Sequence, residues 1–281
     1  MSKTIFEAYN DCKRQLEAAG IEDYVFESKQ IIKHITGYTN AQILNNYAQP
    51  LNEYQLNNLT VIIKQRCIHY PLQYILGVWN FFGRDFFVGP GVLIPRSATE
   101  TLIDVCLEKA NQNPASRVLD LCSGTGCVGI TLKCERPDFD VTLAEKFDEA
   151  LTYTQKNASH NNADVKIVKA DVLKGEGADG LYDLIVSNPP YINKSDMQSL
   201  QPEVKFEPET ALDGGEDGLD FYRSIVDNYK KYLSPCGVMA FEVGINQANS
   251  VCEIMKNAGF KNVDTRADLN KIDRVVFGTA N

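Results

Sequence analysis

The first 70 residues carry apolar side chains at the spacing of an α-helix. The first run, with one apolar residue every three or four positions, comprises Ile5, Tyr9, Cys12, Leu16 and Ala19. A second run, residues 25–35, ends before Gly37, and a third follows Asn52, a residue type that favours the start of a helix. These patterns predict a small helical bundle.

The pattern changes to aromatic and β-branched residues at residue 78. In VWNFFGRDFFV, residues 78–88, Gly83 separates two such runs, which predicts a β-hairpin. Ser97 and Glu100 then have the spacing of a capping box, so we expect a helix to begin there. Arg96 and Glu100 are interpreted as mainly structural residues.

Short apolar strands alternate with helical segments in the rest of the chain. The predicted strands are RVLDL (117–121), DVTLAE (140–145), VKIVKAD (165–171), YDLIVS (182–187), GVMAFEVG (237–244) and RVVFG (274–278). Alternation of this kind, with nearly continuous apolar strands, predicts an open, mainly parallel sheet that helices cover. The expected fold class is therefore α/β, a Rossmann-like sheet with a small N-terminal helical domain and a connecting β-hairpin.

The composition is that of an ordinary globular protein. At 281 residues the chain is long enough for about two domains, and no segment is apolar for long enough to span a bilayer. The N-terminal MSKTIFEAYNDCKRQ lacks the apolar core of a signal peptide. The eight cysteines form no CxxC pair and only three histidines occur, so we expect reduced thiols and no metal site. The net charge of −9 argues against broad binding to a nucleic-acid backbone.

A glycine-rich turn follows the first predicted strand, in DLCSGTGCVGI. Gly124 and Gly126 allow a tight turn and a close approach of the backbone to a ligand. Glu145 ends the second strand, where a carboxylate can accept ribose hydroxyl hydrogen bonds, and Asp171 ends the third, where it can meet an adenine. Because GTGCVG also has the GxGxxG spacing, the turn alone fits a nicotinamide enzyme, a methyltransferase or simply tight packing.

The fourth predicted strand ends in Asn188, followed by Pro189, Pro190 and Tyr191. Parallel strands end at one edge of the sheet, so we expect Asn188 to face the same crevice as the glycine turn. The prolines contribute carbonyls but no N–H groups, so this corner is rich in acceptors and suits a target NH₂ group. Tyr191 offers a flat surface for a planar amide or base. The alternative is a Pro-Pro turn that only ends a strand.

Several motifs in order carry a family resemblance. DLCSGTGCVGI, AEKFDEAL and VSNPPYI together resemble class I S-adenosylmethionine-dependent methyltransferases that act on planar nitrogen. With PLQYILG, VLIPRSATETL, FEPETALDGGEDGLDFYR and DLNKIDRVVFG, the chain from about residue 65 onward resembles the glutamine N5-methyltransferases of translation release factors, the HemK type. The resemblance implies an enzyme that uses S-adenosyl-L-methionine to methylate the side-chain amide nitrogen of glutamine in the Gly-Gly-Gln motif of peptide chain release factors.

The resemblance also implies a domain organisation. Residues 1–75 would form a helical substrate-binding domain, residues 76–96 a β-hairpin linker, and residues 97–281 the methyltransferase domain. We expect release factors as protein partners, no direct nucleic-acid or membrane binding, a monomer, and a cytoplasmic location.

The family's functional residues carry over to matching positions. The methionine part of the cofactor would be held by the turn residues Cys122, Ser123, Gly124, Thr125 and Gly126. Glu145 would bind the ribose, and Asp171 and Val172 would flank the adenine. Asn188 would touch cofactor and substrate. The glutamine pocket would be completed by Pro189, Pro190 and Tyr191, with Asn188, Pro189 and Tyr191 as the catalytic set.

Three positions depart from the family pattern. Cys122 stands where the glycine turn usually begins with Gly, and Glu145 is one methylene longer than the usual Asp. Val172 stands where an aromatic residue often follows the adenine-side acid, which puts stacking there in doubt. None of these changes removes a group that the chemistry requires.

The expected reaction is an in-line displacement in which a glutamine amide nitrogen attacks the sulfonium methyl. The Asn188 side-chain oxygen and the Pro189 carbonyl would hold both N–H groups and favour the positive charge that grows on nitrogen. A strong general base is not required.

Three alternatives to this function remain open: a ribosomal-protein glutamine or a base amine of RNA or DNA as target, a nicotinamide oxidoreductase, and a cofactor-binding scaffold without turnover. The acidic charge counts against nucleic acid.

Overall fold

The computed structural model describes residues 3–110 and 116–280 of the protein. The chain divides into two compact units. One unit is Met1–Gly77 together with Gln201–Phe206, and the other is Val78–Leu200 together with Glu207–Asn281. The predicted domain bounds do not anticipate the six residues 201–206 in the first unit.

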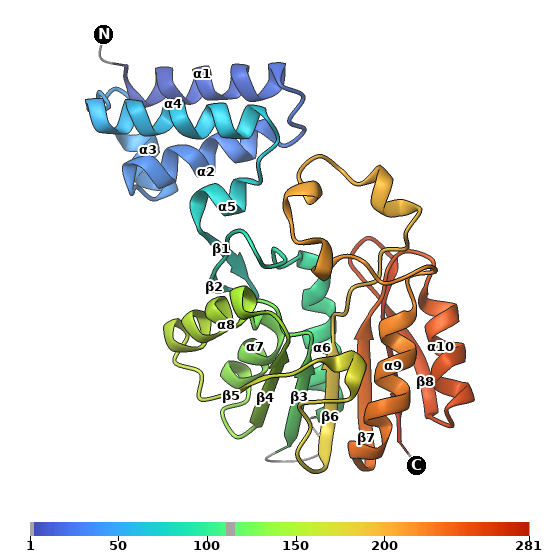
Figure 1. The fold of residues 1–281 in the computed structure, drawn as a ribbon. Helices are drawn as coiled ribbons and strands as arrows, with labels where there is room; N and C mark the ends of the chain where they lie inside the picture. Colours follow the sequence, from blue (N-terminus) through green and yellow to red (C-terminus); the bar gives the residue numbers. More distant parts are fainter. Residues whose placement is uncertain (1–2, 111–115, 281) are drawn as a thin grey trace. The chain divides into compact units, whose positions relative to one another are not determined.

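The first unit is a helical bundle (Figure 1). Its helices are α1 (Ile5–Ala18), α2 (Tyr24–Thr36), α3 (Asn40–Asn45), α4 (Glu53–Cys67) and α5 (Leu72–Leu76). As predicted, Asn52 caps α4, and its side-chain oxygen accepts a hydrogen bond from the Gln55 N–H at 2.9 Å. Gly37, with φ of 70°, ends α2 in the left-handed conformation that glycine adopts readily. The short helices α3 and α5 are not predicted by the apolar pattern.

A buried arginine explains why residues 201–206 belong to this unit. The Arg66 side chain is 4% exposed, and its guanidinium donates to Glu27 at 2.6 Å and to Glu203 at 2.9 Å. His69 Nδ1 lies 2.9 Å from the same Glu203 oxygen. The Tyr70 and Phe206 rings meet edge to face with centroids 5.2 Å apart. An arginine buried this deeply needs both carboxylates, so Glu203 fixes its segment to the bundle.

The second unit contains a hairpin and a large sheet. The hairpin, β1 (Val78–Phe81) and β2 (Arg84–Phe87), confirms the prediction for residues 78–88. The large sheet has the strand order β5-β4-β3-β6-β7-β9-β8. Strands β3 to β7 pair in parallel, whereas β9 pairs antiparallel with β7 and β8 pairs antiparallel with β9. Its strands are β3 (Arg117–Leu121), β4 (Asp140–Glu145), β5 (Lys166–Lys169), β6 (Tyr182–Ser187), β7 (Leu233–Glu242), β8 (Lys261–Ala267) and β9 (Asp273–Thr279).

Helices cover both faces of this sheet, and each face has its own apolar core (Figure 1). One core holds the alternate β3 residues Leu119 and Leu121 with α9 and α10. The other holds Val118 with α6, α7 and the hairpin. The helices of this unit are α6 (Glu100–Ala110), α7 (Cys127–Glu135), α8 (Asp148–His160), α9 (Asp220–Tyr229) and α10 (Ala248–Asn257). Because strand side chains alternate between faces, nearly continuous apolar strands can fill both cores.

Two sequence predictions about this unit need correction. Ser97 does not cap a helix: Ser97–Thr99 form a 3₁₀ turn, η1, before α6, with no side-chain cap. The Glu100 carboxylate instead accepts a hydrogen bond from the Phe82 N–H at 2.8 Å, so a tertiary contact replaces the capping box. The third strand ends at Lys169, and Asp171 caps the short 3₁₀ helix η2 (Val172–Lys174), accepting from the Leu173 N–H at 3.2 Å.

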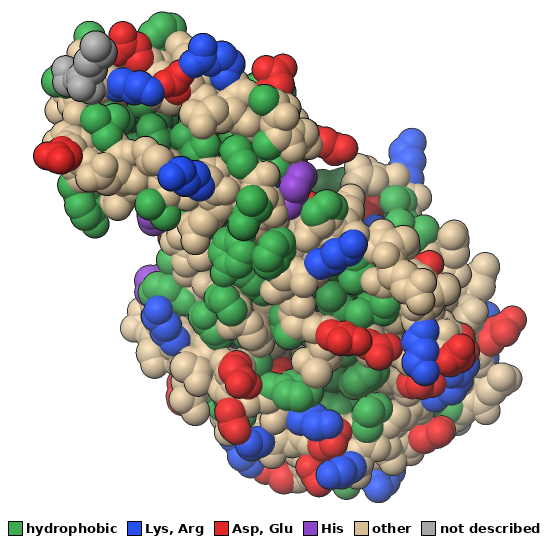
Figure 2. Space-filling model, turned by 45° about the horizontal axis from the view of Figure 1, so that its top comes forward, with side chains coloured by type: hydrophobic (Ala, Val, Ile, Leu, Met, Phe, Trp, Pro, Cys, Tyr) green, Lys and Arg blue, Asp and Glu red, His purple; other side chains and the backbone are tan. Residues whose placement is uncertain are grey.

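The surface mixes charges of both signs. On the face drawn in Figure 2, acidic and basic side chains are interspersed over the molecule. None of the helices within residues 3–110 and 116–280 combines the length and the apolar character needed to cross a membrane.

Candidate active site

The topology brings the glycine turn and Asn188 to one place. The chain winds outward from β3 through β4 to β5 and then returns to β6, so β3 and β6 flank the switch point of the sheet. Leu121 of β3 pairs with Ser187 of β6, whose hydroxyl donates to the Leu121 carbonyl at 2.6 Å. Cys122 and Asn188 are the next residues on these two strands. The sheet register therefore places the start of the turn beside the amide.

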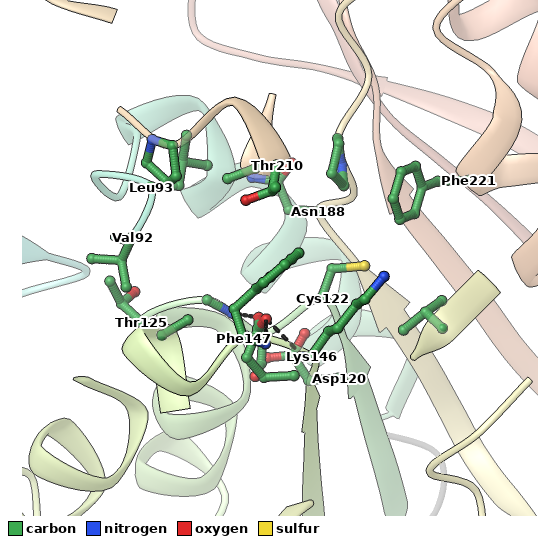
Figure 3. Close-up of a pocket in the computed structure, with 18 of the residues that line it drawn as sticks. Val92, Leu93, Asp120, Cys122, Thr125, Lys146, Phe147, Asn188, Thr210 and Phe221 are labelled. Carbon is green, nitrogen blue, oxygen red and sulfur yellow. Dashed lines mark hydrogen bonds between the residues drawn. The ribbon is translucent and has the colours of Figure 1, made fainter. Parts of the chain in front are cut away.

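A cavity of about 400 Å³ lies at this edge of the sheet (Figure 3). Its size is in the range of small-molecule and cofactor sites. The predicted site residues that line it are Cys122, Ser123, Gly124, Thr125, Glu145, Asp171, Val172, Asn188 and Pro190. Pro189, Tyr191 and Gly126 are outside this lining set. The roles predicted for all of these residues remain proposals.

The turn between β3 and α7 has a strongly constrained backbone. Cys122, Gly124 and Gly126 all have positive φ, of 59°, 55° and 79°. The Thr154 hydroxyl donates to the Gly124 carbonyl at 2.7 Å, and the Asn157 side chain donates to the Thr125 carbonyl at 2.9 Å. Cys122 adopts a conformation that glycine would adopt more readily.

Glu145 holds the turn in place. Its carboxylate is buried and accepts from the Gly124 N–H at 2.8 Å, from the Lys146 N–H at 2.7 Å and from the Phe147 N–H at 3.0 Å. These bonds join the end of β4 to the turn after β3. The carboxylate therefore has a structural role that the sequence did not indicate, besides lining the cavity.

We expect Glu145→Ala to weaken binding of S-adenosylhomocysteine by about 1–3 kcal/mol, because the variant removes a charged acceptor that lines the cavity and holds the half-buried Gly124 N–H of the turn. Isothermal titration calorimetry measures this directly. Asp148→Ala is the matched control, since Asp148 is an acid three residues on, 75% exposed and paired with Lys169. Normal affinity in Glu145→Ala together with slow turnover would contradict a cofactor role for this carboxylate.

The cavity lining also includes one paired acid and apolar groups. The Asp171 carboxylate lies 3.1 Å from the Lys146 ammonium. Burial acts to raise the pKa of Asp171, but Lys146 and the hydrogen bonds to the carboxylate outweigh it and lower that pKa. Phe147 and Phe221 also line the cavity, as Figure 3 shows. The sequence analysis missed these two aromatic rings.

A second buried acid lies under the turn. Asp120 is 1% exposed, lines the cavity, and accepts from the Gly129 N–H at 2.9 Å. Burial raises the pKa of Asp120 to about 8, with the Gly129 hydrogen bond acting to lower it and the Glu145 charge to raise it. Three carboxyl groups in a partly aromatic cavity suit a ligand with cationic groups, hydroxyls and a planar base. These residues therefore fit S-adenosylmethionine.

Asn188 presents an acceptor without a partner. Its amide nitrogen donates to the Thr99 hydroxyl at 3.3 Å. Its Oδ1 atom is buried and has no hydrogen-bond partner among the described residues. A buried acceptor left without a donor is unfavourable, so the site is prepared for an incoming N–H group.

Pro190 and Tyr191, the last two residues of the predicted pocket, differ in their surroundings. Pro190 lines the cavity, whereas the Tyr191 side chain packs against the core under α9 and α10. The Tyr191 hydroxyl donates to Glu242 at 3.5 Å. Burial raises the pKa of Tyr191, so the phenol stays neutral.

The segment ALDGG, residues 211–215, braces this corner. Ile192 makes two backbone hydrogen bonds with it: the Ile192 N–H donates to the Leu212 carbonyl at 2.9 Å, and the Ile192 carbonyl accepts from the Gly214 N–H at 2.8 Å. A Cβ atom on Gly214 would lie 2.7 Å from the Tyr191 Cα and 2.9 Å from the Pro190 carbonyl oxygen. Only glycine allows this approach.

We expect Gly214→Ala to displace Pro190 and Tyr191 and to reduce turnover by about 10- to 100-fold, while S-adenosylhomocysteine affinity stays nearly unchanged. Initial rates and calorimetry test this. Glu216→Ala is the control in the same segment, because the Glu216 side chain is 84% exposed. Equal rates for the two variants would show that the close approach does not matter.

Comparisons with known proteins identify the family. Residues 97–204 match the methyltransferase small domain, and residues 7–77 match the PrmC N-terminal domain. A release factor glutamine methyltransferase of Geobacter sulfurreducens is 39% identical over 276 residues, 98% of this chain and 96% of that protein. One of Clostridium acetobutylicum is 36% identical over 266 residues, 93% of each chain. The chain belongs to the release factor glutamine methyltransferase family.

Membership of this family confirms the resemblance found in the sequence and makes the chain a methyltransferase. It decides against a nicotinamide oxidoreductase. The crystal structure of a methyltransferase from Pyrococcus furiosus matches with a TM-score of 0.53 at 18% identity, over 72% of this chain and 91% of that one. That likeness, with the mainly parallel sheet, confirms the predicted fold class.

Proposed function

We propose that this methyltransferase transfers a methyl group to the side-chain amide nitrogen of the glutamine in the Gly-Gly-Gln motif of peptide chain release factors. The observation that carries the proposal is Asn188, which lines the cavity and whose buried Oδ1 has no hydrogen-bond partner among the described residues. A primary amide of a substrate supplies the N–H donors that this atom lacks. The names of the relatives at 39% and 36% identity support release factors as the protein substrates.

S-adenosyl-L-methionine is the proposed cofactor, and when bound it supplies an electrophilic methyl group on a sulfonium. We propose that the turn residues Cys122 to Gly126 hold its methionine part. Glu145 takes the ribose, and Asp171 and Val172 lie along the adenine. Phe147 and Phe221 add the aromatic surface at that end of the cavity.

The substrate roles fall to the segment after β6. The Asn188 Oδ1 and the Pro189 carbonyl each accept one N–H of the glutamine amide, which fixes the direction of the nitrogen lone pair. Both acceptors carry partial negative charge and so stabilise the positive charge that develops on that nitrogen. Pro190 forms a wall of the pocket, and Tyr191 supports this wall from behind.

The helical unit is proposed to bind the release factor. On this proposal residues 1–75 are the substrate-binding domain, residues 76–96 a linker and residues 97–281 the methyltransferase domain. The protein is proposed to act as a monomer in the cytoplasm and to recognise protein, not nucleic acid. The mixed surface charge supports this choice, since nucleic-acid sites are strongly basic (Figure 2).

Mass spectrometry of modified peptides tests the function. Incubation of the protein with S-adenosylmethionine and a Gly-Gly-Gln peptide should add one methyl group on the glutamine side chain. Gly-Gly-Glu and Gly-Gly-Asn peptides are the matched controls and should stay unmodified. Glutamate lacks the nitrogen, and asparagine is one methylene too short. Methylation of RNA or of a ribosomal-protein glutamine without methylation of this peptide would overturn the proposal.

A further inference from the structure

A buried glutamate stands beside Asn188 with no role in the proposed function. Ser187 of β6 pairs with Phe241 of β7, so Asn188 and Glu242 are the next residues on two neighbouring strands. Glu242 is 1% exposed. Its Oε2 atom has no hydrogen-bond partner in the part of the chain that the structure describes. A carboxyl group this deeply buried costs stability, which points to a use.

Glu242 contacts the proposed glutamine pocket in two ways. The Tyr191 hydroxyl donates to its Oε1 atom at 3.5 Å. The Thr99 hydroxyl interacts with the same carboxyl group and acts to lower its pKa. Thr99 also accepts the Asn188 amide hydrogen bond at 3.3 Å. A hydroxyl has a single hydrogen, so when Thr99 accepts from Asn188 it can direct that hydrogen to Glu242.

We propose that Thr99 and Glu242 are positioning residues that fix the orientation of the Asn188 amide. With Glu242 ionised, the Thr99 hydrogen is held by the carboxylate, and Thr99 can only accept from Asn188. The amide nitrogen must then face Thr99, and Oδ1 is left for the substrate. Without that carboxylate the Thr99 hydroxyl could donate to a flipped amide and take away the acceptor. The inference rests on the proposed function, because it assigns these residues to the same glutamine.

The ionisation of Glu242 makes the inference testable by pH. Burial raises the pKa of Glu242 to about 7, against the lowering effects of Thr99, Arg274 and Arg96. Five other ionisable groups, on the elements packed around Glu242, interact electrostatically with its carboxyl group. They are Arg96 before η1, Tyr191 after β6, Arg274 in β9, Tyr222 in α9 and Cys127 in α7. Of these, burial raises the pKa values of Tyr191, Tyr222 and Cys127 above the neutral range. Glu242 is thus the group of this set that changes charge near pH 7.

The first experiment compares Thr99→Val, Thr99→Ser and Glu242→Gln in steady-state assays with a Gly-Gly-Gln peptide between pH 6 and pH 9. We expect kcat of the unmodified protein to rise with pH through about 7, and kcat of Glu242→Gln to be low and to lack this rise. Thr99→Val should lose about 10- to 100-fold in kcat with a smaller change in the cofactor KM. Thr99→Ser, which keeps the hydroxyl, should regain most of that loss. Thr152→Val, on the exposed side of α8, is the control for removing a hydroxyl.

The second experiment measures peptide binding without turnover. With S-adenosylhomocysteine present, calorimetry should show that the unmodified protein prefers the Gly-Gly-Gln peptide to the Gly-Gly-Glu peptide, because Oδ1 repels a carboxylate. Thr99→Val should lose this preference while keeping its S-adenosylhomocysteine affinity. If Thr99→Val and Glu242→Gln keep the peptide preference, kcat and pH profile of the unmodified protein, the positioning role is wrong. Failure of the unmodified protein to methylate the peptide would instead refute the proposed function.

Discussion

Asn188→Ala should lower methyl transfer to a Gly-Gly-Gln peptide by about a hundred- to a thousandfold, the range seen when one preorganised polar group is removed from a reacting centre. The variant removes the buried Oδ1 acceptor and the donor to Thr99 together. Its affinity for S-adenosylhomocysteine should change far less, because the turn and Glu145 are untouched. Initial rates by mass spectrometry and affinity by calorimetry give the two quantities.

Asn188→Asp separates the acceptor from the donor. Its carboxylate keeps an oxygen for the substrate N–H but loses the amide hydrogen bond to Thr99. We therefore expect Asn188→Asp to retain more transfer than Asn188→Ala and less than the unmodified protein. Asn80→Ala is the matched control, because Asn80 is an exposed asparagine in β1. Normal turnover in both Asn188 variants would remove this residue from the mechanism.

Much of the site follows from the sequence because parallel sheets constrain where strand ends lie. The turn after residue 121 and the amide at residue 188 are 66 residues apart, yet alternation of strands and helices predicts that both lie at one edge. The observed pairing of Leu121 with Ser187 supplies the register. The same argument predicts that Glu145, at the end of another parallel strand, lies at this edge of the sheet.

Other parts of the site depend on contacts that a single sequence does not encode locally. Glu100 has the spacing of a capping residue but bonds to the Phe82 N–H, 18 residues before it. Phe221 lies in the first turn of α9 and still lines the cavity, together with Pro208 and the short 3₁₀ helix Glu209–Ala211. Glu242 lies beside Asn188 only because β7 pairs with β6 in the sheet, and the sequence alone does not show this pairing. The motif FEPETALDGGEDGLDFYR carried the family resemblance, but its spacing gives no sign of which residues line the cavity.

Glu203 illustrates the same limit for domain boundaries. It lies between two segments of the sheet-containing unit but pairs with the buried Arg66, 137 residues earlier in the sequence. The predicted domain bounds, which follow the family resemblance, place residues 201–206 with the sheet. The buried ion pair holds this segment to the helical unit, because breaking it would leave part of the guanidinium charge without a partner.

Gly124→Val should abolish cofactor binding and leave the protein largely folded. Apart from the adjacent Ser123 and Thr125, no described residue has a heavy atom within 4 Å of the position that a Cβ would take on Gly124. Gly124 lines the cavity, so a branched side chain there occupies ligand space without a clash inside the protein. Its N–H bond to Glu145 and carbonyl bond from Thr154 hold the turn in place, which prevents the backbone from moving away. We expect a loss of S-adenosylhomocysteine affinity of at least about a hundredfold by calorimetry.

Backbone strain is the competing explanation for that result, and Gly83→Val isolates it. Gly124 and Gly83 both have positive φ, of 55° and 73°, and around both the described chain leaves the Cβ position free within 4 Å. Valine at either site therefore carries a similar strain of about 1–2 kcal/mol, and thermal unfolding should show comparable losses of stability. Gly83 lies in the hairpin turn outside the cavity lining, so Gly83→Val should bind the cofactor normally. If both variants lose affinity equally, strain explains the effect; if neither does, the turn does not hold the cofactor.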